Sequence, residues 1–229
     1  RMVGSRDSVA SPNVILNTIV AESFADTCDY LEQAEDFEMA VHDLIKKYAT
    51  EHQRIVFSGN GYSEEWVEEA KRRGLPNIRT MVESIQYLCD EKSVQMFERF
   101  HVFSRAELES RAEIKYEAYA KAVNIEARSM IDIASKHIIP AVIRYVTALA
   151  TSVNQVHQAS SLADTSVQDD LLVEASRLLT ETKTALQKLV DVMNGVGDRA
   201  EGKEQAYYFM EQVVPAMENL RKHVDELEM

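Results

Sequence analysis

Residues 54–79 read Arg-Ile-Val-Phe-Ser-Gly-Asn-Gly-Tyr-Ser-Glu-Glu-Trp-Val-Glu-Glu-Ala-Lys-Arg-Arg-Gly-Leu-Pro-Asn-Ile-Arg, and turn-forming residues gather here more than elsewhere in the chain. The stretch holds three of the seven glycines, one of the four prolines and the only tryptophan. Good helix formers dominate the rest of the sequence. The contrast predicts an all-α fold with one short turn-rich insertion.

A short helix is predicted inside this stretch. Ser63 suits the N-cap, and the two glutamates after it place carboxylates at the positive end of the helix dipole. The last turn is basic, and Gly74 followed by Pro76 forms a typical C-terminal stop. Residues 59–61 are expected to form a turn because Gly and Asn tolerate positive φ, and the apolar run 55–57 is compatible with a strand-like extension.

Longer helices are predicted on both sides of the turn-rich stretch. Apolar residues at helical spacing indicate helices over 13–34, 35–52 and 77–100, with Asn13 as the N-cap of the first. Ser104-Arg105-Ala106-Glu107 is a capping box, so a long helical pattern should begin there and run to about His157.

The last hundred residues carry three apolar seams with steps of three and four. Their members are Ile131, Ala134, Ile138, Ala141, Tyr145, Ala148 and Ser152; Leu171, Ala175, Leu178, Thr182, Ala185, Leu189 and Val192; and Ala206, Met210, Val213, Met217, Leu220, Val224 and Leu227. Short polar connections separate the seams, so we predict an antiparallel bundle of about three helices, each about 25–30 residues long. Pro140 and Pro215 should kink two of these helices.

Composition excludes several partner classes. The net charge of −13 disfavours nucleic acid and anionic membranes as partners. No apolar run approaches the roughly 18 residues of a membrane span, and no signal peptide opens the chain, so a cytoplasmic protein is expected. Cys28 and Cys89 are then expected to be reduced, buried thiols, with a disulfide as the minor alternative.

Chemistry-bearing motifs are scarce. None of the six histidines has another His or Cys at ligand spacing, so no zinc site is expected. The sequence contains no nucleophile elbow, phosphate-binding loop or dinucleotide fingerprint, and its clustered glutamates are typical of a charged helix face. Tyr207-Tyr208-Phe209 suits either an exposed contact patch or the edge of a buried seam.

Several blocks of the chain nevertheless resemble a known enzyme family. Asn60-Gly61-Tyr62-Ser63-Glu64-Glu65-Trp66, then Glu69-Ala70 and Arg73-Gly74-Leu75-Pro76-Asn77, closely resemble the C-terminal region of the type III glutamine synthetases. Further blocks agree in the same order, among them Leu16-Asn17-Thr18-Ile19-Val20-Ala21-Glu22, Glu91-Lys92-Ser93, Val102-Phe103-Ser104, Asn124-Ile125-Glu126-Ala127 and Ile139-Pro140-Ala141. The resemblance runs from residue 1 to about 150, and beyond that it is mostly a shared helical character.

The resemblance implies a large enzyme that ligates ammonia to L-glutamate with ATP and Mg²⁺, giving L-glutamine. Its active site would lie between neighbouring subunits of stacked hexameric rings, so self-association is expected. The family's metal-binding, nucleotide-binding and most glutamate-binding residues lie upstream of this sequence. We therefore expect no catalytic, cofactor-binding or metal-binding residue in this chain, and no activity from the chain alone.

Only Arg1 carries over as a candidate site residue. The segment Arg1-Met2-Val3-Gly4-Ser5 resembles the family's segment that begins at an arginine binding the substrate glutamate. A guanidinium suits this role because it can bind a carboxylate through two hydrogen bonds. The alternative, which the chain taken alone favours, is that Arg1 is simply a disordered terminus, because the strand and the metal-ligand Glu that would set its position are missing here.

The expected organisation has two parts. Residues 1–120 would be the tail of the catalytic domain, and residues 121–229 a helical extension that serves packing or assembly. The competing interpretation, from another functional class, is a standalone helical interaction or adaptor bundle without catalysis.

Overall fold

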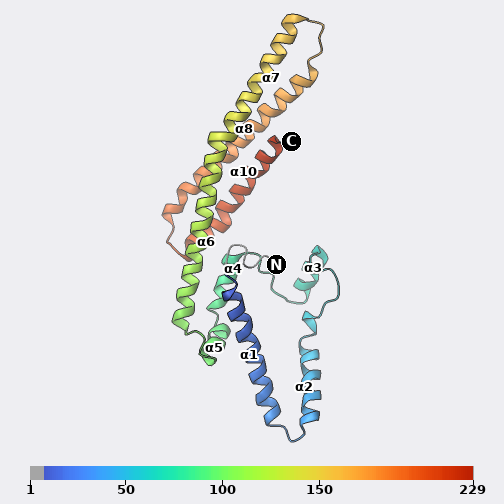
Figure 1. Cartoon of the computed structure of the whole chain (residues 1–229), viewed down its shortest axis with the longest axis vertical. Coiled ribbons are helices and arrows are strands. Elements are labelled where there is room, and N and C mark those ends of the chain that lie inside the picture. Colours follow the sequence, from blue (N-terminus) through green and yellow to red (C-terminus); the bar gives the residue numbers. More distant parts are fainter. Residues whose placement is uncertain (1–7, 229) are drawn as a thin grey trace. The chain divides into compact units, whose positions relative to one another are not determined.

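A computed structural model describes residues 8–228, and every regular element in that range is a helix (Figure 1). The prediction of an all-α fold is therefore confirmed. The chain divides into two compact units, one ending at Ala112 and the other beginning at Glu113. Within residues 8–228, no helix combines the length and apolarity needed to cross a membrane.

The first unit is built from short and medium helices. In chain order they are α1 (Ala10–Glu32), α2 (Phe37–Glu51), the 3₁₀ turn η1 (Gln53–Ile55), α3 (Glu64–Arg72), α4 (Met81–Ile85), the 3₁₀ turn η2 (Gln86–Leu88), α5 (Glu91–Arg99) and the start of α6 (Arg105–Ile133). The single helix expected over 77–100 is thus broken into three pieces. The first piece, α4, begins at a second capping box, between Thr80 and Glu83.

Two local predictions were wrong. Helix α1 begins at Ala10, so Asn13 is not its N-cap; Pro12 lies in the first turn, where its missing N–H removes no intrahelical hydrogen bond. Residues 55–57 form no strand: Ile55 belongs to the η1 turn, and Val56 after it is extended but pairs with no other strand among the described residues.

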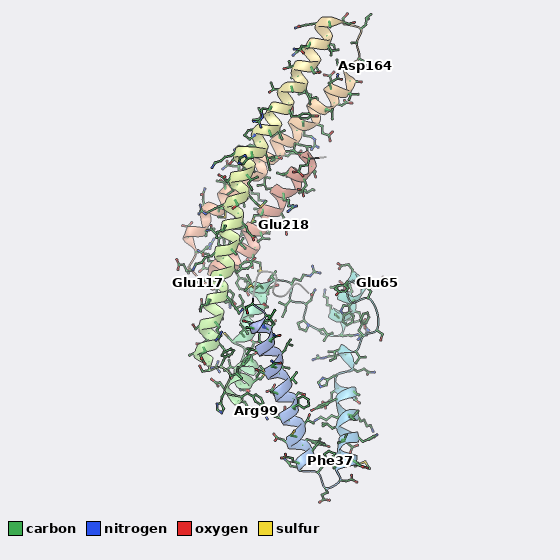
Figure 2. The ribbon with its side chains drawn as sticks, in the orientation of Figure 1. Phe37, Glu65, Arg99, Glu117, Asp164 and Glu218 are labelled. Atoms are coloured by element: carbon green, nitrogen blue, oxygen red, sulfur yellow. The ribbon has the colours of Figure 1, made fainter. Side chains whose placement is uncertain are left out.

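The core of the first unit lies between α5 and the start of α6. Its buried residues are Val94, Met96, Phe97 and Leu108, with Val14, Ile15, Cys89 and Phe103 packed against them. On its surface Arg99 pairs with Asp26 of α1, with 2.6 Å between Nη1 and Oδ1 (Figure 2). The predicted capping box at Ser104 is confirmed, since the Glu107 carboxylate accepts from the Ser104 N–H at 2.8 Å and Glu107 N–H donates to Ser104 Oγ at 3.4 Å.

The second unit is an antiparallel bundle of three long helical segments (Figure 1). The first segment continues α6 through the π turn η3 (Ala134–Ile138) into α7 (Ile139–Ala159). The second is α8 (Ser166–Asn194), followed by the 3₁₀ turn η4 (Gly195–Asp198). The third runs through α9 (Lys203–Tyr208), the π turn η5 (Phe209–Val213) and α10 (Val214–Leu227). Helix α8 contacts both α7 and α10, as an up-down-up arrangement requires.

The bundle core confirms the third seam, and it confirms the second from Ala175 onward; Leu171, the first member of the second seam, is 42% exposed. The buried residues that form it are Ala120, Val123, Ala127, Ala134, Ala185, Leu186, Leu189, Met193, Phe209, Val213, Ala216 and Leu220. The expected helix length of about 25–30 residues holds for α8, which has 29. The first segment is longer than expected, because helical turns continue without a break from Arg105 to Ala159.

The first seam holds only as far as Ile138. Beyond it Ala141, Tyr145 and Ala148 are exposed. The half-buried positions lie one residue later, at Val142, Val146, Leu149, Val153 and Val156. A π turn contains one more residue than an α turn, so η3 rotates the buried face by one position.

Both π turns stand in the same relation to a proline. Each ends two residues before one, Pro140 after η3 and Pro215 after η5. Proline lacks the N–H for the i−4 carbonyl, and its ring clashes with that carbonyl in an α turn. A wider turn just before the ring relieves this clash, so a π turn replaces the regular α turns there while the helix continues; the kinks expected at Pro140 and Pro215 stay predictions.

Candidate functional site

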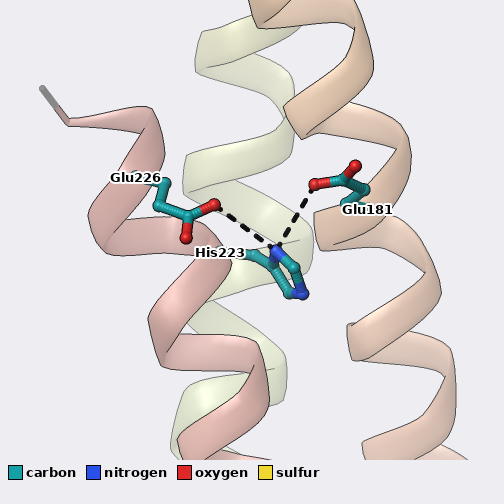
Figure 3. A group of neighbouring side chains, drawn as sticks. All are labelled: Glu181, His223 and Glu226. Atoms are coloured by element: carbon teal, nitrogen blue, oxygen red, sulfur yellow. Dashed lines mark ion pairs between the residues drawn. The ribbon is translucent and has the colours of Figure 1, made fainter.

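His223 and two glutamates form a compact group in the bundle (Figure 3). His223 and Glu226 lie one turn apart on α10, and Glu181 lies on α8. The His223 Nδ1 atom is 3.6 Å from Glu181 Oε2 and 3.8 Å from Glu226 Oε2. One candidate ligand atom from each of the three side chains lies within 4.8 Å of the other two.

The seams explain why these side chains meet. On α8, Glu181 immediately precedes the fully buried Thr182, so it lies at the edge of the buried face. On α10, His223 follows the buried Leu220 by three positions, and Glu226 follows His223 by three, which places all three on one side of the helix. The packing of α8 against α10 then brings Glu181 to His223.

One ring nitrogen of His223, Nδ1, has no hydrogen bond to the described residues. The side chain is 22% exposed, yet Nδ1 itself is buried and has no hydrogen-bond partner among the described residues. Its two carboxylate neighbours are beyond the 2.7–3.2 Å range of an N–H···O hydrogen bond. A buried polar atom without a partner destabilises a fold, so this arrangement favours an additional cation between the groups.

The surroundings orient the group and leave it accessible. Arg177 Nη1 donates to Glu181 Oε1 at 2.7 Å, which leaves Oε2 of the same carboxylate facing the histidine. Because of that hydrogen bond, the pKa of Arg177 is raised. A surface hollow of about 210 Å³ borders His223 and Glu181 and is also lined by Lys188 and Asn219.

Sequence reasoning did not anticipate this group. It considered only His and Cys partners at short spacing, whereas Glu181 comes from another helix. Glu226, three positions after His223 on an amphipathic helix, was the one local signal available. The candidate that sequence reasoning did name, Arg1, lies outside the described residues.

The Tyr207-Tyr208-Phe209 cluster proves to be the edge of a seam. Phe209 is buried in the core, while both tyrosines are half-buried and line an open hollow of about 930 Å³. Tyr208 donates its hydroxyl to the Val192 carbonyl at 2.9 Å, and the Arg199 guanidinium lies 4.9 Å from the Tyr208 ring centroid. These contacts tie the α8–α9 connection to the bundle.

The contacts of the turn-rich stretch 54–79 hold the stretch itself together. Ser63 Oγ accepts from the Trp66 N–H at 3.3 Å, and Gly74 has φ +69°, so both predicted ends of α3 are confirmed. The Phe57 ring stacks on Trp66 with 4.0 Å between centroids. Arg73 donates to the Val56 carbonyl at 2.8 Å, which fastens the preceding loop to the helix.

The glycine turn at 59–61 does not fit the phosphates of the ATP that the family resemblance implies. Two arginines near this turn are already engaged, because Arg72 and Arg73 both donate to Glu69. Those hydrogen bonds lower the pKa of Glu69 to about 2. The Phe57 ring fills the space beside Gly59, so the backbone at this glycine is not open to a phosphate.

Comparison with known proteins gives consistent matches. Residues 40–157 match the family model of the glutamine synthetase C-terminal domain. A type-3 glutamine synthetase of Dictyostelium discoideum is 33% identical over 245 residues, covering 100% of this chain and 32% of the relative. Glutamine synthetases of Butyrivibrio fibrisolvens and Bacteroides fragilis are 31% and 28% identical, covering 85% and 100% of this chain. The chain spans about a third of the length of these relatives.

Proposed function

The chain belongs to the glutamine synthetase C-terminal domain family, and on that premise we propose that it is the C-terminal portion of a type III glutamine synthetase. The whole protein would ligate ammonia to L-glutamate with ATP and Mg²⁺, giving L-glutamine. This portion would supply packing and assembly surfaces, while the chemistry is carried by residues outside it.

The observation that carries this role is an unpartnered apolar face on α1. Its exposed large apolar residues are Leu16, Ile19, Val20 and Phe24, of which Leu16 is 58% and Phe24 66% exposed. Their spacing places them along one side of the helix. A contiguous apolar stripe on a protein surface indicates an interaction site. We propose that the remainder of the catalytic domain covers it, with residues 1–120 forming the tail of that domain.

The bundle contributes the second half of the proposal. Residues 121–229 would form a helical extension that packs against other subunits in the stacked rings typical of the family. Its core is continuous and apolar, as suits a packing module rather than a catalytic one.

Two measurements test the proposal. Purified chain should give no glutamate- and ammonia-dependent ATP hydrolysis above background, whereas the full-length parent enzyme should turn over; activity from the chain alone would refute the division of roles. In the full-length enzyme, the double substitution Leu16→Asp with Phe24→Asp should abolish the assembled particle, as measured by mass photometry. The polar neighbour substitution Asn17→Asp serves as the matched control and should leave the particle intact.

The extension is tested separately by deleting residues 121–229 from the full-length enzyme. We expect smaller particles or a lower thermal midpoint. A particle of unchanged mass and stability would count against an assembly role for the bundle.

A further inference from the structure

We propose that Glu181, His223 and Glu226 form a binding site for a divalent transition-metal cation that joins α8 to α10 (Figure 3). The inference is independent of the synthetase reaction proposed above, because it concerns side chains inside the helical bundle. Its ligand atoms would be Nδ1 of the histidine and one oxygen of each carboxylate.

The spacing of the ligand atoms suits such an ion. In a tetrahedral zinc site the bonds are about 2.0–2.2 Å long, which places neighbouring ligand atoms about 3.4 Å apart. The observed separations from His223 Nδ1 are 3.6 Å and 3.8 Å. Small rotations of the two glutamate side chains would bring all three atoms to bonding distance of a common point.

The buried, unsatisfied nitrogen is a separate observation that indicates a ligand. A neutral imidazole binds metals through the lone pair of an unprotonated nitrogen. His223 Nδ1 is buried, lacks a hydrogen bond among the described residues and faces two carboxylate oxygens. A cation between these atoms would satisfy all three groups together.

The donor set selects the class of metal. An imidazole with two carboxylates suits zinc, cobalt or manganese, whereas magnesium and calcium favour oxygen ligands alone. Three protein ligands leave at least one coordination position for water, which the hollow beside Lys188 and Asn219 can supply. Arg177 holds Glu181 through its other oxygen, so one ligand is already oriented.

The ion would act as a clamp between two antiparallel helices. Glu181 belongs to α8, and the other two ligands belong to α10. Metal binding that occurs only in the folded state stabilises that state in proportion to the logarithm of metal concentration. We therefore expect the bundle to be more resistant to unfolding when the site is loaded.

The test is a titration of the intact chain with zinc chloride and, separately, cobalt chloride after treatment with a chelator. At free zinc about a hundred times its dissociation constant, the thermal midpoint should rise by about 5–10 °C. Cobalt should give a saturable visible absorption band with one equivalent per chain. His223→Gln, Glu181→Gln and Glu226→Gln should each weaken zinc binding by at least about tenfold.

Two matched controls separate the site from general surface binding. His42→Gln removes an exposed histidine whose Nδ1 is 3.7 Å from Asp43, and Glu218→Gln removes an exposed carboxylate from the same helix as His223. Both should bind zinc as the unaltered chain does. Circular dichroism of each metal-free variant checks that it folds, and the three ligand substitutions provide independent routes if one does not.

The proposal is overturned if zinc and cobalt do not bind, or if they bind equally well to the ligand variants and the controls. A thermal midpoint that does not respond to zinc or cobalt would show that the three side chains do not join α8 to α10 through a metal. That outcome would also overturn it.

Discussion

Helix α3 and helix α8 are specified in opposite ways. α3 is nine residues long and buries none of its side chains, yet both of its ends were predicted from neighbouring residues alone. α8 has 29 residues and buries seven, while the side chain of its N-cap residue, Thr165, makes no capping hydrogen bond. A short exposed helix thus depends on its caps, whereas a long bundled helix depends on the partners that cover its seam.

The substitution with the largest expected effect on stability tests whether α8 depends on the burial of its seam. Leu189→Ala removes a side chain that is 0% exposed at the centre of the bundle core. We expect the free energy of unfolding to fall by about 2–5 kcal/mol, from lost transfer energy and the cavity left behind. Urea denaturation measures it. Leu162→Ala is the control, because Leu162 is 94% exposed and its loss should change stability by less than about 0.5 kcal/mol.

A smaller effect tests the dependence of α3 on its C-terminal stop. Gly74 has φ +69°, so Gly74→Ala forces a side chain into the left-handed region at about 1–2 kcal/mol. Because α3 has no buried side chain to hold it, faster hydrogen exchange should be confined to its amides and to that of Leu75, which donates to the Ala70 carbonyl. Gly61→Ala is the matched control, since no atom lies within 4 Å of the added carbon. Equal effects of the two substitutions would contradict the assigned role of Gly74.

The smallest effect concerns the ion pairs of α3. Hydrogen bonds from Arg72 and Arg73 lower the pKa of Glu69 to about 2, from an ordinary value of 4.5. A depressed pKa stabilises the folded state fully above the unfolded value and loses this contribution as pH falls through about 2. Carboxyl chemical shifts of Glu69 followed by NMR between pH 1.5 and 6 should place the midpoint near 2. A midpoint near 4.5 would show that the pairs do not persist in solution.

Glu69→Gln provides the control for that titration. The variant retains the length of the side chain and removes its charge. In the unaltered chain, the amides of α3 should lose protection from hydrogen exchange when Glu69 is protonated by acid. In the variant this loss of protection should disappear, and the protection of the α8 amides should remain unchanged.

The sequence predicted those features whose causes are local. Ser63 and Gly74 were identified because a capping hydroxyl and a positive φ act within one turn. The seams on α8 and α10 were also predicted, since burial repeats along a helix with a fixed period. By contrast, Asn13 was a wrong N-cap because nothing local forbids Pro12 from the first turn.

Features that depend on two distant segments were not predictable. Glu181 and His223 are brought together by the packing of α8 on α10, and no spacing rule relates residues on different helices. The displaced face of α7 was missed for another reason. Sequence periodicity assumes a uniform helix, and the extra residue in η3 breaks that assumption at one point.

The π turn at Ala134–Ile138 has a consequence for how relatives of this chain are aligned. Gaps are normally placed in loops, because loops tolerate changes of length. Here the π turn adds one residue within a helix that continues on both sides of it. Pro140 follows the turn by two positions, and the extra residue makes room for its ring. Relatives without a proline at position 140 are therefore expected to be one residue shorter within this segment, with the gap inside the helix and the same apolar positions in register on both sides.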